Sequence, residues 1–193
     1  MPGQPLTTAR LFACLNAFLD PDTILVADVG DALFGSLDLC IAHAADYLSP
    51  AYYLSLGFGV PGAIGAQLAQ PDHRVLALVG DGAFQMTGME LSTVARYGLN
   101  PIVVVLNNKG YGTERPLLDG PFNDLHAWRY HRIPEVLGAG RGFLVETEDQ
   151  LSRALQAARA DTASYSLLDV QLAPRDLSDA LQRLTAALAK RVK

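Results

Sequence analysis

The sequence predicts an α/β fold, a parallel β-sheet with helices on both faces. Short apolar runs alternate along the chain with segments whose apolar residues recur every three to four positions, which indicates alternating strands and helices. The apolar runs are continuous and contain few polar residues, as expected for strands covered on both faces. With 193 residues the chain has the length of one substantial domain, so we expect a single domain over 1–193.

The apolar runs give the expected strands, and the three-to-four spacing gives the expected helices. Strands are predicted at 23–28, 74–80, 101–106, 142–146 and 165–172. Helices are predicted at 7–19, 84–98, 147–160 and 175–192, with Thr147 capping the third. The segment 107–131 is rich in Gly, Pro, Asn and Asp and has no clear period. So long an irregular segment in a compact domain indicates a functional role.

The composition argues against several classes of protein. The 15 basic and 20 acidic residues give a formal charge of −5, and no Lys/Arg cluster offsets it, so we expect no nucleic-acid partner. The apolar runs are far shorter than the ~18 residues that a membrane span needs. The first ten residues have no signal-peptide pattern, so we expect a cytoplasmic protein. Cys14 and Cys40, in apolar surroundings, are predicted to be small core residues.

Polar residues follow three of the predicted strands, at the ends where ligands collect in parallel sheets. Gly30 and Asp31 follow the first strand, Asp81 the second, and Asn107 and Asn108 the third. A carboxylate, a carboxamide oxygen and a backbone carbonyl form an all-oxygen set that suits magnesium or calcium. Neighbouring glycines allow the backbone to approach a ligand, and a helix expected to start near position 84 offers N–H groups to an anion. The residues therefore predict a metal-bridged diphosphate site.

Two other interpretations of these residues remain open. Taken singly, Asp81 is equally well a helix cap and the asparagines are turn residues. Residues 57–62 read GFGVPG after an apolar segment at 51–56, and Asp81 lies 19 positions further on, which is the spacing of a dinucleotide-binding fingerprint. That interpretation leaves the asparagine pair, the long irregular segment and Glu114 without roles.

The segment GDGAFQMTGMELSTVARYGLNPIVVVLNN (80–108) resembles the signature of thiamine diphosphate-dependent enzymes, in which GDG is followed by NN. The placement of Asn108, 27 positions after Asp81, matches as well. The resemblance covers most of the chain and corresponds to the domain that binds the cofactor's diphosphate, usually the C-terminal third of such enzymes. SLGFGVPGAIGAQLAQPD (55–72) is similar to the acetolactate synthase and benzoylformate decarboxylase branches. NNKGYGTER with GPFNDLHAW (120–128) is more similar to the pyruvate, indolepyruvate and phenylpyruvate decarboxylases, and this match contains more functional residues.

The resemblance implies thiamine diphosphate and Mg2+ as cofactors. The metal would be held by Asp81, the side chain of Asn108 and the carbonyl of Gly110. The diphosphate would be bound by backbone groups of Gly82, Ala83, Gly112 and Thr113. Ala83 stands where the family often has serine, so a hydroxyl contact is absent while a backbone contact remains. Leu56 matches the bulky residue that holds the cofactor bent, Leu54 would offer its carbonyl to the pyrimidine amine, and Gly30 and Asp31 would lie near the pyrimidine ring.

Glu114 matches the glutamate that, in the decarboxylase branch, protonates or steers the intermediate left after carbon dioxide departs. Burial can tune a carboxyl group at a cleft rim toward neutral pH. The alternative is a surface glutamate paired with Arg115. His126 and His131 are candidates for either substrate contact or structure, and Trp128 is expected to anchor the long segment.

The family's pyrimidine-activating glutamate belongs to another domain, and neither that domain nor the usual middle domain is found in this chain. We therefore expect no useful activity from the chain alone, and a partner that is a second copy or a pyrimidine-binding domain or subunit. The chain would be a subunit of a split enzyme or a segment of a longer one. The predicted reaction is non-oxidative decarboxylation of a 2-keto acid. Alternatives are an acetolactate synthase-like carboligase, a dinucleotide-binding oxidoreductase domain and a degenerate binding module.

Overall fold

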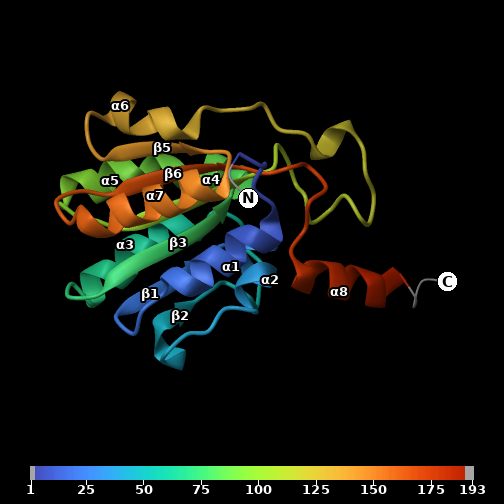
Figure 1. Cartoon of the computed structure of the whole chain (residues 1–193), viewed down its shortest axis with the longest axis horizontal. Coiled ribbons are helices and arrows are strands. Elements are labelled where there is room, and N and C mark those ends of the chain that lie inside the picture. Colours follow the sequence, from blue (N-terminus) through green and yellow to red (C-terminus); the bar gives the residue numbers. More distant parts are fainter. Residues whose placement is uncertain (1–2, 190–193) are drawn as a thin grey trace.

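The chain folds as a six-stranded parallel sheet with helices on both faces, as the sequence predicts (Figure 1). The structure, a computed structural model, describes residues 3–189. The strands are β1 (Thr23–Ala27), β2 (Tyr47–Leu48), β3 (Arg74–Gly80), β4 (Ile102–Asn107), β5 (Arg141–Val145) and β6 (Ser166–Gln171). They lie in the order β2-β1-β3-β4-β6-β5, and every neighbouring pair is parallel.

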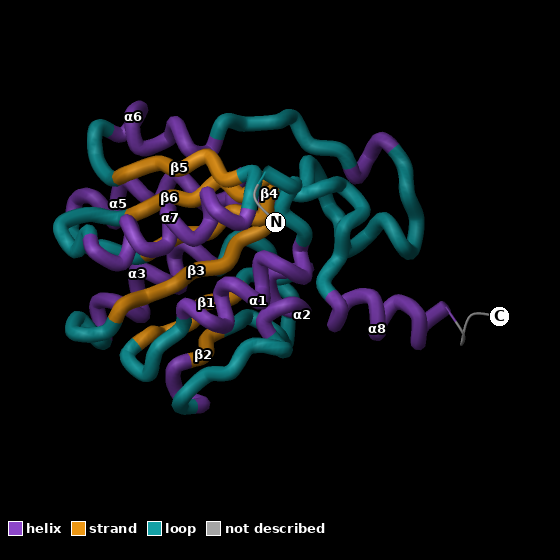
Figure 2. Tube along the Cα trace, in the orientation of Figure 1, coloured by secondary structure: helices purple, strands orange, loops and turns teal. Residues whose placement is uncertain are grey.

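Helices cover the two faces of the sheet, and irregular segments connect them to the strands (Figure 2). The α-helices are α1 (Thr8–Phe18), α2 (Asp31–Ser36), α3 (Gly59–Ala69), α4 (Asp81–Thr87), α5 (Leu91–Arg96), α6 (Ile133–Leu137), α7 (Glu148–Ala160) and α8 (Asp179–Ala189). Short 3-10 turns are η1 (Ala44–Asp46), η2 (Gly88–Glu90), η3 (Pro121–Asn123) and η4 (Tyr130–Arg132). The segment between β4 and η4 is the long irregular one that the sequence predicts.

The core consists of two apolar layers, one on each face of the sheet. Leu76 and Leu78 of β3 face the layer that includes α1 and α7. Val75 and Val79 face the opposite layer, with residues of α3, α4 and α5. Successive strand residues point to opposite faces, so a continuous apolar run fills both layers. Each fully buried aliphatic side chain contributes about 1.5–3 kcal/mol to folding.

One predicted helix is divided. The sequence predicts a single helix over 84–98, whereas the chain forms α4 from Asp81, then η2, then α5. The break is at Gly88, where the ring of Phe84 packs so closely that an added Cβ would lie 2.3 Å from it. Beside it, the Thr87 hydroxyl donates to the Gly57 carbonyl at 2.7 Å. A glycine that weakens the helix and a tertiary hydrogen bond together end α4.

Other differences from the predicted elements are smaller. The ends of the predicted strands shift by at most one residue, and β2, α2 and α6 are elements that the apolar periodicity did not indicate. The helix predicted at 175–192 begins at Asp179, and its expected residues 190–192 lie outside the described range. Cys40 is exposed and Cys14 is partly buried, so the prediction that Cys40 is a core residue is wrong. Cys40 lies in an irregular segment beyond α2, not in a helix or strand facing the core.

The order of the strands places a crevice at one end of the sheet. After β1 the chain forms the edge strand β2, and through α3 it returns to β3 on the other side of β1. In open parallel sheets, ligands bind at the carboxyl ends of the strands at such a reversal. The residues after β1 and β3, which the sequence predicts as site residues, are therefore brought to the same crevice.

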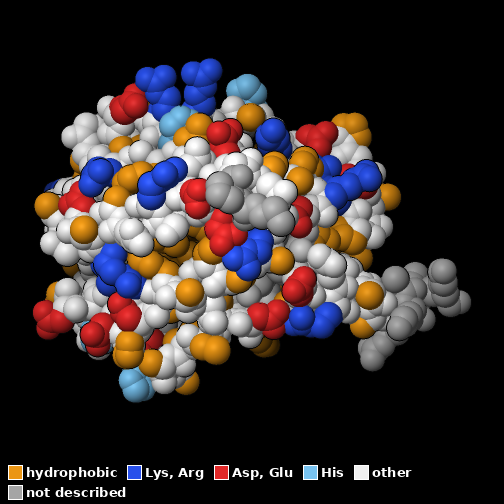
Figure 3. Space-filling model, in the orientation of Figure 1, with side chains coloured by type: hydrophobic (Ala, Val, Ile, Leu, Met, Phe, Trp, Pro, Cys, Tyr) orange, Lys and Arg blue, Asp and Glu red, His pale blue; other side chains and the backbone are white. Residues whose placement is uncertain are grey.

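The surface shown in Figure 3 mixes Lys and Arg side chains with Asp and Glu. This face has no continuous basic stripe of the kind that nucleic-acid-binding proteins present. Within residues 3–189, none of the helices has the length and apolar composition needed to cross a membrane.

Helix α7 gives a direct test of one sequence-predicted cap. The Thr147 side chain accepts from the Gln150 N–H at 3.4 Å, and the Gln150 side chain accepts from the Thr147 N–H at 3.1 Å, which is a capping box. Thr147→Ala should therefore lower the free energy of unfolding by about 1 kcal/mol. Urea unfolding would measure this as a lower midpoint with an unchanged slope. Ser152→Ala, on the exposed face of α7, is the control and should change stability by less than about 0.5 kcal/mol.

Candidate functional site

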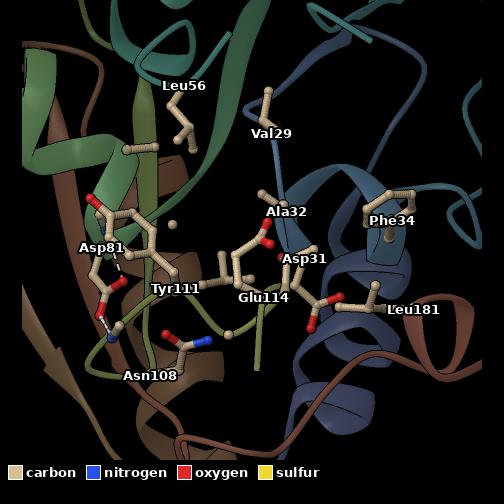
Figure 4. Close-up of a pocket in the computed structure, with 18 of the residues that line it drawn as sticks. Val29, Asp31, Ala32, Phe34, Leu56, Asp81, Asn108, Tyr111, Glu114 and Leu181 are labelled. Carbon is tan, nitrogen blue, oxygen red and sulfur yellow. Dashed lines mark hydrogen bonds between the residues drawn. The ribbon is translucent and has the colours of Figure 1, made fainter. Parts of the chain in front are cut away.

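A cavity of about 350 Å³ lies at the carboxyl ends of β1, β3 and β4 (Figure 4). Its lining includes every site residue that the sequence predicts: Gly30, Asp31, Leu54, Leu56, Asp81, Gly82, Ala83, Asn108, Gly110, Gly112, Thr113 and Glu114. These residues come from four separate stretches of the chain. The structure therefore brings the predicted residues together, while their roles toward a ligand remain predictions.

Asp81 is the first residue of α4 and is only 2% exposed. Its Oδ1 accepts the N–H of Gly82 at 2.8 Å, and its Oδ2 accepts the N–H of Gly110 at 3.0 Å. Burial raises the pKa of the Asp81 carboxyl to about 6, although these N–H groups oppose the rise. The carboxylate is thus costly to ionise unless a positive charge is bound beside it.

Asn108 places its carboxamide on the other side of the same crevice. Its Oδ1 is buried and has no hydrogen-bond partner among the described residues, and in Figure 4 this oxygen is on the side that faces Asp81. A buried acceptor without a partner is rare, and it indicates a site for a missing cation, donor or water. Gly112 permits this arrangement, because an added Cβ there would lie 2.4 Å from the Asn108 Nδ2.

The backbone between these two side chains turns sharply at Lys109 and Gly110. Lys109 has a φ of 63°, and Gly110 has a φ of 157°. An added Cβ at Gly110 would lie 2.1 Å from the carbonyl oxygen of Asn123, which accepts the N–H of Tyr111 at 2.9 Å. The Gly110 carbonyl accepts one hydrogen bond, from the Gly112 N–H at 2.9 Å, and a carbonyl oxygen has a second lone pair for a cation.

The charges of the cavity favour a cation. Its lining includes the carboxyl groups of Asp31, Asp81 and Glu114, and none of the Lys, Arg or His residues that the structure describes. The charge of Arg115 slightly lowers the pKa of Asp81, but Arg115 is outside the lining. It pairs with Asp119 at 2.9 Å and with Asp124 at 2.7 Å. An anion such as a diphosphate would meet carboxylates here unless a metal ion came with it. Because hard oxygen donors suit Mg2+, the residues present fit that ion.

The predicted metal ligands include only one charged side chain. Within residues 3–189, no three His, Cys, Asp or Glu side chains gather as a metal site. The set predicted from sequence contains one carboxylate, one carboxamide and one main-chain carbonyl. Mg2+ normally completes such a set with water and phosphate oxygens.

Asp31 is already engaged by another part of the protein. Its Oδ2 accepts the N–H of Ser178 at 2.8 Å, and its Oδ1 accepts the Ser178 hydroxyl. Burial raises the pKa of the Asp31 carboxyl, and the bonds from Ser178 oppose the rise. Asp31 thus ties α2 to the residue that precedes α8, and its predicted place beside a pyrimidine ring would be shared with this structural role.

Glu114 lies at the exposed rim of the cavity, on the turn that follows Thr113. The alternative, an ion pair between Glu114 and Arg115 at the surface, is not found among the described residues, because Arg115 pairs with Asp119 and Asp124. In Figure 4 the Glu114 side chain projects into the cavity toward Ala32. Glu114 is therefore placed where a carboxyl group would meet a ligand, which its predicted catalytic role requires.

The remaining predicted residues line the walls. Leu54 has a φ of 55°, a rare conformation for leucine that indicates a constrained turn. Leu56 is 40% exposed although it is apolar, because it faces the open cavity. Thr113 approaches Gly30, where an added Cβ would lie 3.1 Å from the threonine Oγ1. The N–H of Gly82 already donates to Asp81, so Gly82 could offer this group to a ligand only by sharing it.

Several lining residues were not predicted from sequence. They are Val29, Ala32, Phe34, Leu106, Tyr111, Leu117, Leu181, Leu184 and Thr185. Those of α8 form a wall that only the tertiary fold brings to the site, although the spacing of 175–192 indicated a helix. His126 and Trp128 lie outside the cavity lining, and Trp128 packs against the core, as expected of an anchor. His131 also lies outside it, where its Nδ1 bonds to Asp169 at 2.7 Å.

The dinucleotide-binding interpretation is not supported by the structure. Residues 51–56 form a turn and not the strand that such a fingerprint follows. The N–H groups of Gly57 and Gly59 donate to the buried carboxylate of Asp28, at 3.2 and 2.7 Å. Those glycine N–H groups are therefore occupied by the protein, and a pyrophosphate could not take them without displacing Asp28.

Fold and cavity together define an α/β domain with an acidic cavity at the reversal of strand order. A family model described as "Thiamine pyrophosphate enzyme, C-terminal TPP binding domain" matches residues 17–170. The chain belongs to this family, whose cofactor, thiamine pyrophosphate, is another name for thiamine diphosphate.

Relatives of known name agree with this assignment. The chain is 40% identical over 186 residues to the indole-3-pyruvate decarboxylase of Azospirillum brasilense, covering 94% of this chain and 33% of that protein. It is 33% identical over 190 residues to the alpha-keto-acid decarboxylase of Mycobacterium tuberculosis (strain ATCC 25618 / H37Rv), covering 96% of this chain and 34% of that protein. The chain therefore spans about a third of the length of these relatives.

The raised pKa of Asp81 predicts how metal-free stability depends on pH. The folded chain binds the Asp81 proton more tightly than the unfolded chain, so this group adds stability at low pH and loses it as pH rises through about 6. Asp81→Asn removes the titration. The unfolding free energy of the wild type minus that of Asp81→Asn should be about 2 kcal/mol larger at pH 4 than at pH 7. Urea unfolding in EDTA measures it, and a difference that is constant with pH would contradict the prediction.

Proposed function

We propose that this chain is the diphosphate-binding domain or subunit of a non-oxidative 2-keto acid decarboxylase, and that it binds thiamine diphosphate through Mg2+. The observation that carries the proposal is the cavity itself, which is rich in carboxyl groups and, among the described residues 3–189, has no basic side chain in its lining. A diphosphate fits such a cavity only together with a cation. The family assignment supports thiamine diphosphate as the ligand, and the names of the relatives support decarboxylation.

The metal would be held by Asp81, the Oδ1 of Asn108 and the carbonyl of Gly110. The unpartnered Oδ1 of Asn108 supports this arrangement, because a cation would satisfy it. The cation would also favour the ionised form of Asp81, whose pKa burial has raised to about 6. Binding of Mg2+ below this pH would therefore release a proton from Asp81.

When bound, thiamine diphosphate supplies the electron sink that allows a 2-keto acid to lose carbon dioxide. The residues of this chain would orient the cofactor and exclude water. Leu54 and Leu56 form an apolar wall on one side, and Leu181 of α8 forms part of another. The predicted backbone contacts are those of Gly82, Ala83, Gly112 and Thr113, and Gly30 and Asp31 would lie toward the pyrimidine.

Glu114 would move the proton in this reaction. Its carboxyl group projects into the cavity from the turn that follows Thr113. A positioned carboxyl group of this kind contributes about 10²–10⁴-fold to a rate when it transfers a proton. We therefore assign Glu114 the catalytic role on this chain.

The remainder of the active site would come from elsewhere. The chain spans about a third of the length of its relatives, and we propose that a pyrimidine-binding domain or subunit, from the same or a second copy, completes the site. A homo-oligomer, probed by the experiment below, is one form of this partner. We also propose a cytoplasmic location, which the free thiols of Cys14 and Cys40 support, because reducing compartments keep thiols free.

Calorimetric titration tests the binding part of the proposal. The wild-type chain should bind thiamine diphosphate in Mg2+ and lose it in EDTA. Asp81→Ala should weaken binding by more than about a hundredfold. Loss of a residue that only hydrogen-bonds to a metal ligand already lowers metal affinity about 10–100-fold. Asp72→Ala, which removes an exposed carboxylate just before β3 at the amino ends of the strands, is the matched control and should bind as the wild type does.

The same titration with NAD or FAD separates the alternatives. Neither nucleotide should bind, with or without metal. Metal-independent binding of NAD or FAD, or binding of thiamine diphosphate that survives Asp81→Ala, would contradict the proposed site.

The role of Glu114 requires a measurement of turnover. The chain alone should decarboxylate no 2-keto acid, and light scattering of the active mixture should give the mass of an oligomer once a pyrimidine-binding domain is supplied. In that mixture, Glu114→Gln should bind thiamine diphosphate normally but lower kcat about 10²–10⁴-fold. A Glu114→Gln variant with the wild-type kcat, or robust activity from the chain alone, would refute this assignment.

A further inference from the structure

Both ends of the long site-bearing segment are attached to one buried side chain, Asp169 of β6. The segment leaves the sheet after Asn107, the last residue of β4, and returns at His131 in η4. Between these ends it carries Asn108 and Glu114, among other cavity residues. Asp169 is 1% exposed and does not line the cavity.

Each carboxylate oxygen of Asp169 serves one end of the segment. Oδ1 accepts the side-chain N–H of Asn107 at 2.8 Å and that of Gln171 at 2.7 Å. Oδ2 bonds to the Nδ1 of His131 at 2.7 Å and also accepts its backbone N–H at 3.4 Å. The carboxylate thus makes four hydrogen bonds, three of them from residues at the two ends of the segment.

The bond to Asn107 bears directly on the orientation of its neighbour. Asn107 is 3% exposed, and its carbonyl accepts the N–H of Leu172 at 3.0 Å, so both its side chain and its backbone are fixed to the β6 strand. Successive residues at a strand end point to opposite faces. With Asn107 held toward Asp169, the next carboxamide, that of Asn108, is directed into the cavity.

The bond to His131 fixes the other end. Apolar packing is not directional, whereas a buried hydrogen bond to a carboxylate fixes both the distance and the orientation of its donor. Tyr130 also holds this end, by a T-shaped contact with Phe84 at 5.3 Å. Asp169 therefore adds a directional contact to an apolar one, and it links this end to the end at Asn107.

We propose that Asp169 is a positioning residue that closes the segment 107–131 into a loop of fixed base and so presents Asn108, Gly110 and Glu114 to the ligand. The inference rests on the proposed function for what the loop binds, but not for the loop closure itself. Two adjacent asparagines at the end of β4 then have separate tasks: Asn107 fastens the backbone to Asp169, and Asn108 faces the metal site.

Variants at the His131 end test the closure without touching a cavity residue. His131→Leu removes the side-chain donor, whereas His131→Asn restores it, because the asparagine Nδ2 occupies the place of the histidine Nδ1. Gln67→Ala is the control: Gln67 is a buried amide, 4% exposed, that accepts the N–H of Asn100 at the amino ends of the strands. Asn107→Ala is a second variant, for the other end.

Two readouts on the 193-residue chain decide the proposal. The first is hydrogen exchange of the backbone amides of 109–125 without ligand, and the second is the Mg2+-dependent Kd for thiamine diphosphate. His131→Leu and Asn107→Ala should speed the exchange about tenfold or more, as the loss of a hydrogen bond to a charged group implies. They should also weaken the Kd about 10–100-fold. His131→Asn should recover most of both, and Gln67→Ala should change neither by more than about threefold.

The outcomes separate the two proposals. If His131→Leu exchanges no faster than Gln67→Ala over 109–125, or His131→Asn recovers nothing, Asp169 does not close the loop. Faster exchange with an unchanged Kd would show closure without positioning and overturn the inference. If the wild-type chain binds no thiamine diphosphate, the proposed function fails, and the exchange measurement alone decides whether Asp169 closes the segment.

Discussion

The structure depends on one constraint, the burial of the Asp81 carboxylate at the carboxyl end of β3. The group is 2% exposed, burial raises its pKa to about 6, and the backbone N–H groups of Gly82 and Gly110 donate hydrogen bonds to its oxygens. In the part of the chain that the structure describes, no basic side chain lines the cavity beside it. This arrangement supports the proposed cation site, because a cation there would neutralise the carboxylate and carry an anionic ligand with it.

The rest of the site follows from how a parallel sheet brings strand ends together. The reversal of strand order beside β1 opens the crevice, and the strand register places Gly80 opposite Leu106, so that Asp81 and the asparagine pair leave the sheet at the same level. Gly110 and Gly112 permit the turn after β4, because a side chain at either position would overlap Asn123 or Asn108. Asp169 bonds to the start of the segment through Asn107. Helix α8, whose preceding residue Ser178 bonds to Asp31, lines another side of the cavity.

The sequence predicted those features that local patterns determine. The continuous apolar runs identified β1, β3, β4, β5 and β6, and the family motif identified residues that all line one cavity. Features that depend on tertiary contacts were missed. The two-residue β2 and the short α2 are too brief for any periodicity, and the break at Gly88 requires knowledge that Phe84 packs against it. The partners of Asp28 and Asp169 lie 29 and 62 positions away in the chain, and no local pattern connects them. The glycines at 57 and 59 matched a dinucleotide fingerprint in spacing, but their N–H groups bond to Asp28.

Location of the metal tests the central claim most directly. Crystals of the chain grown with thiamine diphosphate and Mn2+ in place of Mg2+ would show the metal by its anomalous scattering. The account predicts one strong peak between Asp81, the Oδ1 of Asn108 and the carbonyl of Gly110, with the diphosphate beside it. A diphosphate bound at residues 57–62, or a cofactor bound in the cavity with no metal peak at Asp81, would contradict it.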